Sequence, residues 1–277
     1  MDKENNTLLE TGAAIAGAAA GSGIGVAIAG PAGAIGGAAI GAVVQNAIQW
    51  IGKEVKERQL SKREEKKIGT VYELAKEKIS KNIEEGKAIR NDGFFSSNGD
   101  DRPSSEEITE EIMFAAQRES EEKKLPYLSN LYANIFFDET IDKPLAFQLI
   151  RMAEQMTYRQ MQIISLIGGM QLAIQAINFP GDTPLKKEQY TSVSGYTNIS
   201  IATDIFALYR EGILQSKSAI LDPAGITPAN LSVGGCGALL FNMMELTSIP
   251  FDGSTPNIVL FLMDEKKRID DTGKDSI

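Results

Sequence analysis

Hydrophobic and polar residues alternate differently in three successive parts of the chain. The first part, residues 1–52, is mostly glycine and alanine and carries no charged side chain from Thr11 to Gly52. The second part, 53–93, is dense in lysine and glutamate, with apolar residues mostly three and four positions apart. The third part, 94–277, mixes apolar and polar residues as globular domains do. The pattern predicts a mainly α-helical protein with an N-terminal Gly/Ala-rich helical hairpin, a long charged helix and a C-terminal helical domain.

Small residues recur at every fourth position of the charge-free stretch. Glycine in a helix interior costs about 1 kcal/mol relative to alanine. That cost is recovered where helix backbones approach each other closely, and membrane helices use such contacts most often. We therefore expect this register to form a contact surface for self-association. Its glycines are Gly17, Gly21, Gly25, Gly33, Gly37 and Gly41, with Ala13 and Ala29 in the same register.

Pro31 divides the charge-free stretch, whose length is about twice the ~20 residues that cross a bilayer once. Proline lacks a backbone donor, and Gly30-Pro31 is a turn signal. This stretch could form two short helices in a re-entrant or spanning hairpin, or one kinked helix. A glycine triplet on each side of Pro31 favours the hairpin. Large apolar residues are few, so we expect insertion to be conditional. The alternatives to insertion are a flexible linker and a soluble hairpin buried in an oligomer core.

Basic residues follow the charge-free stretch closely, whereas only Lys3 precedes it. The excess of positive charge places the C-terminal side in the cytoplasm. Trp50, the only tryptophan, lies at the end of the charge-free stretch. It could lie at the membrane interface or pack against other residues. We expect a cytoplasmic protein that associates with the inner membrane. The basic flank consists of Lys53, Lys56, Arg58, Lys62 and Arg63.

The charged stretch from Lys53 to Arg90 has one apolar stripe, which includes Ile68, Val71 and Ile79. A solvated helix with one packed stripe is one interpretation, and a coiled-coil-like stalk that oligomerises the glycine segment is the other. Turn-forming residues in 94–105 predict a loop, and we place a domain boundary there.

Helical periodicity continues through most of the third part. An acidic first turn predicts a helix that begins at Ser104 or Ser105. Near the C-terminus, a small hairpin at Ile220–Leu221 with a turn at 222–225 would give a winged-helix-like element. Without a basic recognition face, that element would bind protein or simply pack. The other predicted elements are helices at 125–137, 144–177 (one or two), 199–214 and 231–246, and a strand at 258–263.

Composition narrows the classes of function. The net charge of −9 argues against nucleic-acid binding, which needs a basic surface. The chain has no histidine and a single cysteine, which removes the commonest general base, the commonest metal ligand and any internal disulfide. Met1–Glu10 is too acidic for a secretory signal. We expect no enzyme, no cofactor and no metal, and we expect the carboxylates of Asp100, Asp101, Asp138, Glu139 and Glu154 to be solvated surface groups.

Parts of the chain resemble a known family. The run from Glu119 through Leu125-Pro-Tyr-Leu128 to Asn134 is similar to the segment of Abi-alpha proteins where an acidic-basic run leads into a helix. Downstream, the run Leu149-Ile-Arg-Met-Ala-Glu-Gln-Met156 looks like the helix pair of that family. Asp204–Leu214 looks like the closing helix of that family. Abi-alpha proteins are associated with abortive infection, a bacterial antiviral defence that sacrifices the infected cell. The resemblance covers about half of the chain and implies no catalytic residues.

Two functions follow from these features. The first is a conditional membrane effector, in which the helical domain senses or restrains and the glycine zipper oligomerises as a pore-forming toxin at the inner membrane. The second is a non-toxic interaction protein, tethered or soluble, whose helical domain binds a partner. The expected partners are the membrane, further copies of the chain and a regulatory protein.

Overall fold

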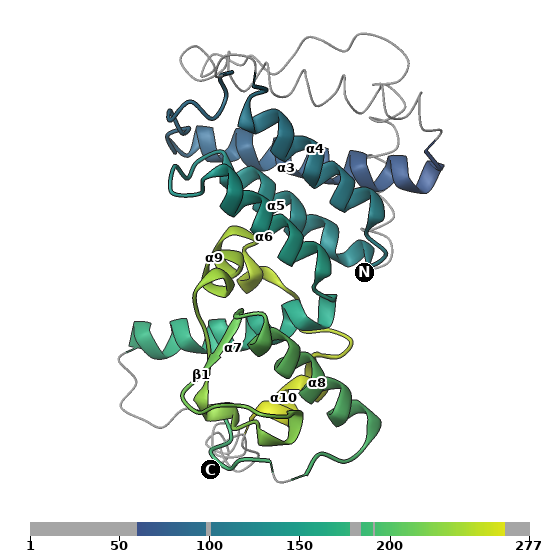
Figure 1. Ribbon diagram of the computed structural model, residues 1–277, viewed down its shortest axis with the longest axis vertical. Helices are drawn as coiled ribbons and strands as arrows, with labels where there is room; N and C mark the ends of the chain where they lie inside the picture. The colour runs from purple at the N-terminus through teal and green to yellow at the C-terminus, as the bar shows by residue number, and fades with distance from the viewer. Residues whose placement is uncertain (1–59, 98–100, 178–183, 191, 264–277) are drawn as a thin grey trace, which may run out of the picture. The chain divides into compact units, whose positions relative to one another are not determined.

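The computed structural model describes residues 60–97, 101–177, 184–190 and 192–263 (Figure 1). The described elements are helices and one two-stranded antiparallel sheet, which confirms the predicted mainly helical fold with a small β element. The chain divides between Gln155 and Met156 into two compact units, called unit 1 and unit 2 below. The glycine segment and most of its basic flank lie outside the described residues.

In the described part of unit 1, four helices and a short 3-10 turn pack together. Helix α3 packs against α4 and α5, and α6 packs against the same pair (Figure 1). The buried stripe of α3 includes Ile68, Val71, Ala75 and Ile79, so the predicted apolar stripe is covered from within the same chain. The elements are α3 (Lys62–Glu84), α4 (Ser104–Arg118), η2 (Glu122–Lys124), α5 (Leu125–Ile135) and α6 (Lys143–Gln155).

The connection between α3 and α4, where we predicted a domain boundary, lies inside unit 1. Phe94 is buried, and its ring packs edge-on against Phe136 of the α5–α6 connection with centroids 5.9 Å apart. The backbone N–H of Ser105 donates to the carbonyl of Phe94 over 3.0 Å. Because these contacts bury the connection, the described chain divides after α6 instead.

Unit 2 is built around α7 (Tyr158–Ile177), which is buried on nearly every side from Met161 to Gly168. Its buried apolar residues include Met161, Ile163, Ile164 and Ile167. Elements α8, α9, α10 and β2 each pack against this helix. These elements are α8 (Tyr196–Arg210), β1 (Leu214–Ser216), β2 (Leu231–Val233), α9 (Cys236–Met243) and α10 (Thr255–Leu262).

Gly212 turns the chain from α8 into β1. Its φ of 72° is in the left-handed region that favours glycine. The N–H of Gly212 donates to Tyr209 and that of Ile213 to Leu208, which together form a Schellman motif. The glycine-terminated helix predicted here is confirmed, with its end at Arg210.

The predicted hairpin and final strand were placed wrongly. The strands pair Leu214 with Val233 and Ser216 with Leu231, so Ile220 and Leu221 lie in the connection between them. The predicted helix 231–246 therefore begins as strand β2. A turn at Gly234-Gly235 follows, with φ of 53° at Gly235, and the helix is confined to α9. The short helical turns η3 (Pro223–Gly225) and η4 (Pro228–Asn230) complete the long connection.

The apolar run predicted as a strand at 258–263 is instead most of helix α10. A proline in the first turn starts the helix, and Ile258, Phe261 and Leu262 share its buried face. An apolar run this short fits either a strand or a buried helix. Only Met263 takes part in a β-bridge here, with Leu185.

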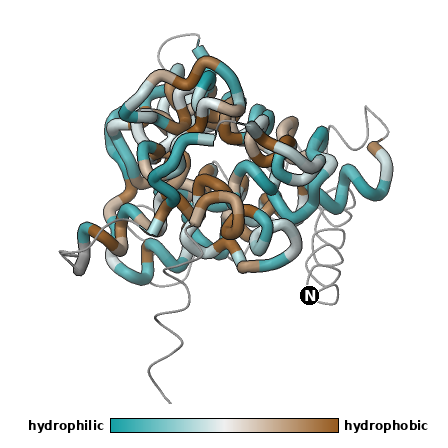
Figure 2. The backbone as a smooth tube through the Cα atoms, turned by 90° about the horizontal axis from the view of Figure 1, so that it is seen from below, coloured by the Kyte–Doolittle hydropathy of each residue, from teal (hydrophilic) through white to brown (hydrophobic). Residues whose placement is uncertain are grey.

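Hydrophobic and hydrophilic residues alternate along the helices (Figure 2), as expected where one face of each helix is buried. Within the described ranges, no helix is both long and apolar enough to cross a membrane.

Candidate functional site

Two of the predicted functional residues lie within the described residues, and the others lie outside them. Lys62 and Arg63 occupy the first turn of α3, and the Arg63 guanidinium donates to Glu122 over 2.8 Å. These two residues of the basic flank therefore lie at the start of the described fold. The residues outside the described ranges are Gly17, Gly21, Gly25, Gly33, Gly37, Gly41, Pro31, Trp50, Lys53, Lys56 and Arg58.

The start of α3 is fixed by a capping box. The Ser61 hydroxyl accepts the N–H of Glu64, and the Glu64 carboxylate accepts the N–H of Ser61 over 2.8 Å. The side-chain amide of Gln117, at the end of α4, donates to the same carboxylate over 3.1 Å. Hydrogen bonds from Ser61 and Gln117 lower the pKa of Glu64 to about 2, so the cap is charged at neutral pH.

Next to this cap, three charged side chains are almost completely buried: Lys67, Glu119 and Lys124, called the buried ion cluster below. The Lys67 ammonium donates to the backbone carbonyls of Gln117 and Glu119, over 2.8 Å in the second case. The Lys124 ammonium forms an ion pair with the Glu119 carboxylate. It also donates to the carbonyl of Glu154, at the end of α6, over 2.8 Å.

The cluster joins the starts and ends of several elements of unit 1. Lys67 lies on α3, Glu119 follows α4, and Lys124 ends η2. Burial lowers the pKa of Lys67, because desolvation disfavours the ammonium. Charges buried in this way are costly to leave unpaired, and removal of one partner typically destabilises a protein by about 3–5 kcal/mol. Lys67 therefore joins the start of α3 to the end of α4, and Lys124 joins the α4–α5 connection to the end of α6.

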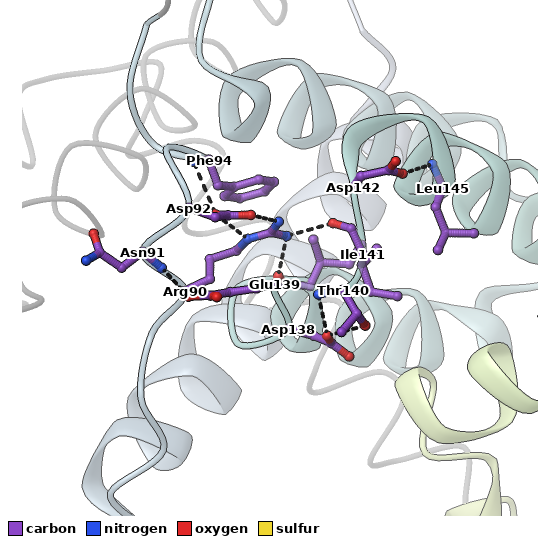
Figure 3. Close-up of polar contacts among 11 residues, drawn as sticks. Arg90, Asn91, Asp92, Phe94, Asp138, Glu139, Thr140, Ile141, Asp142 and Leu145 are labelled. Atoms are coloured by element: carbon purple, nitrogen blue, oxygen red, sulfur yellow. Dashed lines mark hydrogen bonds and ion pairs between the residues drawn. The ribbon is translucent and has the colours of Figure 1, made fainter.

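A second buried charge, that of Arg90, ties the α3–α4 connection to the α5–α6 connection (Figure 3). Its guanidinium donates to the carbonyls of Ile135 and Ile141 over 3.2 and 2.9 Å, and it forms an ion pair with Asp92. It also lies 4.2 Å from the centroid of the Phe94 ring. We call this set of contacts the Arg90 clamp.

Three of the carboxylates considered for catalysis, those of Asp138, Glu139 and Glu154, accept hydrogen bonds from other parts of the described chain. Asp138 accepts the N–H of Thr140 over 2.9 Å, and Glu139 accepts that of Asn91 over 3.0 Å (Figure 3). Glu154 accepts two hydrogen bonds from Arg118, at 2.6 and 3.1 Å. Among the described residues, no three acidic or cysteine side chains come together to hold a metal ion. The contacts of Glu139 and Glu154 join separate elements of unit 1.

Sequence reasoning missed the buried ion cluster and the Arg90 clamp. Lys67 precedes Ile68 in a helix whose other lysines are exposed or half-buried, and Lys124 ends an acidic-basic run whose pattern is typical of solvated surface. Their burial depends on carbonyls and carboxylates from remote parts of the chain. The only local signal was Ser61-Lys-Arg-Glu64, a capping-box pattern that marks the start of α3.

No family model, no curated protein and no solved structure matches this chain. The resemblance to Abi-alpha proteins therefore stays a prediction from the helical segments quoted above.

Proposed function

We propose that this protein is a conditional membrane effector of bacterial antiviral defence, in which the helical units restrain a glycine-zipper segment that oligomerises and disrupts the inner membrane. The observation that carries the proposal is the charge-free stretch from Thr11 to Gly52 with its glycine at every fourth position. Such a register suits close helix packing within a bilayer. The basic flank and the resemblance to Abi-alpha proteins support the same function.

The anchoring of α3 supports the conditional part of the proposal. The basic flank leads into α3, whose start is fixed by the capping box and by the buried Lys67 ammonium. Because this ammonium is costly to bury without its carbonyl partners, we expect the start of α3 to be either docked with these bonds made or released with the ammonium in water. Release of this anchor would free the segment that precedes α3.

Leakage of a dye from liposomes with anionic lipid tests the membrane function of the full-length chain. Bulky residues in the glycine register block close helix approach, so Gly21→Leu with Gly37→Leu is expected to abolish leakage. Gly23→Leu with Gly36→Leu is the matched control, because it adds the same apolar volume outside the register. Equal leakage from both double variants would contradict the proposal.

The restraint is tested separately with Lys67→Met, which removes one buried charge of the anchor. We expect this variant to leak more dye than the wild type at the same protein concentration, and we expect the Gly21/Gly37 pair of substitutions to suppress the increase. If expression is harmless and deletion of residues 11–52 leaves binding of a partner intact, the chain is an interaction protein instead.

A further inference from the structure

A remote segment of the chain caps the C-terminal end of α10. The last four carbonyls of an α-helix have no partner within the helix, so other groups must satisfy them. In α10 the first of these, the carbonyl of Val259, accepts the N–H of Met263 over 2.8 Å. The other three accept hydrogen bonds from residues 184–190, called the strap below.

Two residues of the strap supply these three hydrogen bonds. The Lys186 ammonium donates to the carbonyl of Leu260 over 2.8 Å, and the Lys186 backbone N–H donates to that of Leu262 over 2.9 Å. The Tyr190 hydroxyl donates to the carbonyl of Phe261. Each carbonyl at the end of α10 is therefore hydrogen-bonded, and the strap provides most of the donors.

Further contacts hold the strap in place. The Tyr190 ring stacks on the Phe261 ring, with centroids 4.5 Å apart and an angle of 15° between the planes. Leu185 is buried and pairs with Met263 in an antiparallel β-bridge. The backbone N–H of Tyr190 also donates to the carbonyl of Ile226 over 3.0 Å. The strap thus joins the end of α10 to the connection between β1 and β2.

The start of α10 is held by a more deeply buried contact than its end. Gln162 of α7 is 2% exposed and forms hydrogen bonds with Ser254 and Thr255. In the strap, residues 187–189 are exposed, and so is the hydrogen bond from Lys186 to α10. Segments with exposed hydrogen bonds and few buried apolar contacts open at lower free energy than a packed core. We therefore expect α10 to open from its C-terminal end.

We propose that the strap is a latch on the last turn of α10. When the strap detaches, three carbonyls lose their partners, and this turn unwinds while the start of α10 and α7 stay folded. The turn carries Phe261 and Leu262, whose side chains are buried in the closed form. Unit 2 thus has an open form that exposes apolar surface, and this opening is independent of the anchoring of α3.

Hydrogen exchange of the full-length chain tests the latch. Lys186→Met with Tyr190→Phe removes both side-chain donors, and we expect the amides of residues 259–263 to exchange about 10- to 30-fold faster, with α8 unchanged. The matched control is Glu188→Met, which replaces an exposed charge of the same strap and is expected to exchange as the wild type does. Equal acceleration in α8 would overturn the proposal, because the strap would then stabilise unit 2 as a whole. Unchanged exchange in α10 would also overturn it.

A disulfide between the strap and α10 provides a second test. The Lys186 N–H bonds the Leu262 carbonyl, so Leu185 and Met263 form a non-hydrogen-bonded antiparallel pair. The Cα atoms of such a pair are about 4.5 Å apart, a separation that a disulfide can span. In Leu185→Cys with Met263→Cys, made in a Cys236→Ser background, we expect residues 259–262 to exchange about tenfold more slowly when the pair is oxidised than when it is reduced. Equal rates in the two redox states would overturn the proposal, and so would a pair that does not oxidise.

Discussion

Unit 1 and unit 2 hold their buried polar side chains by different means. In the described part of unit 1, the basic side chains of Lys67, Arg90 and Lys124 are buried and donate to backbone carbonyls. The buried Glu119 carboxylate forms an ion pair with Lys124. In the described part of unit 2, the buried polar side chains are Gln162, Asp204 and Thr255. Unit 1 therefore depends on matched charges, and unit 2 depends mainly on apolar packing around α7.

In unit 2, the neutral side chain of Gln162 is buried by means of several hydrogen bonds. It donates to the Thr255 hydroxyl over 2.8 Å and to the Asp252 carboxylate over 3.1 Å, and it accepts from Ser254 over 2.6 Å. These bonds fix the start of α10 against α7. The ion pair between Arg159 and Asp204, which joins α7 to α8, is partly open to solvent.

The two kinds of contact differ in the free energy that is lost when one partner is removed. Loss of one member of a buried charge pair leaves the other charge unsolvated, so the cost is large and sudden. Loss of one neutral hydrogen bond in a packed helix pair costs about 1 kcal/mol. Unit 1 is thus the unit in which one local change is expected to release a helix.

The largest expected effect is that of Lys124→Met in unit 1. This change leaves Glu119 buried without its ion-pair partner, and we expect unit 1 to lose about 3–5 kcal/mol of unfolding free energy. The corresponding change in unit 2, Arg159→Met, breaks a partly exposed pair, and we expect it to cost only about 1–2 kcal/mol. Urea unfolding followed by hydrogen exchange measures the two units separately. Equal losses would remove the distinction between the units.

The double variant Lys124→Met with Glu119→Gln sharpens that test. If the cost of Lys124→Met comes from the stranded carboxylate, replacement of Glu119 by a neutral residue should restore part of the stability. If the double variant loses as much unfolding free energy as the two single variants together, the packing of the Lys124 stem, and not its charge, stabilises this part of unit 1.

An intermediate effect is expected in unit 2, at adjacent glycines of α7. A Cβ atom at Gly168 would lie 2.6 Å from the Phe241 ring, whereas one at Gly169 would meet nothing within 4 Å. We expect Gly168→Ala to destabilise unit 2 by about 1–3 kcal/mol through overpacking. Gly169→Ala, its matched control, should stabilise the unit by up to about 1 kcal/mol through helix propensity. Thermal unfolding measures both, and equal shifts would mean that α7 and α9 do not pack as closely as described.

The smallest expected effect concerns the charged cap of α3. The pKa of Glu64 in the folded chain is about 2, below its ordinary value of 4.5. Its carboxylate therefore stabilises unit 1 above about pH 4.5, and this contribution is lost as the pH falls towards 2. We expect Glu64→Gln to lower stability by less than about 1 kcal/mol at pH 7 and to match the wild type near pH 2.

Urea midpoints at several pH values measure this difference, with Glu65→Gln as the control, because Glu65 shares the first turn of α3 and lies outside the capping box. A constant difference between Glu64→Gln and the wild type from pH 7 to pH 2 would contradict the prediction.

The helices could be predicted well from local pattern. The acidic first turn marked the start of α4 at Ser104, and the apolar spacing marked α5 and α8. The sequence pattern left one or two helices open for 144–177. The structure shows α6 and α7, separated where Thr157 and Gln160 form reciprocal hydrogen bonds of 2.9 and 3.2 Å. That Thr-x-x-Gln pattern is a capping-box signal that was present in the sequence.

Features that depend on remote partners could not be predicted. The strands lie at Leu214–Ser216 and Leu231–Val233 because α7 and α8 provide the surface that they cover, which no local pattern reveals. In the same way, Lys67, Arg90 and Lys124 are buried because carbonyls from other elements meet them. The glycine register and its role in a membrane stay predictions, since those residues lie outside the described chain.

The burial of Lys67 and Lys124 gives the protein two internal chemical reporters. Amine-reactive labels modify the unprotonated form of an accessible lysine amine, so the exposed lysines of α3, such as Lys62 and Lys81, react first. Lys67 and Lys124 are at most 7% exposed. Lys67 becomes reactive when the start of α3 separates from the end of α4, and Lys124 becomes reactive when its contacts with Glu119 and the end of α6 open. The labelling rates at these two positions thus record how often each contact opens in solution or on a lipid surface.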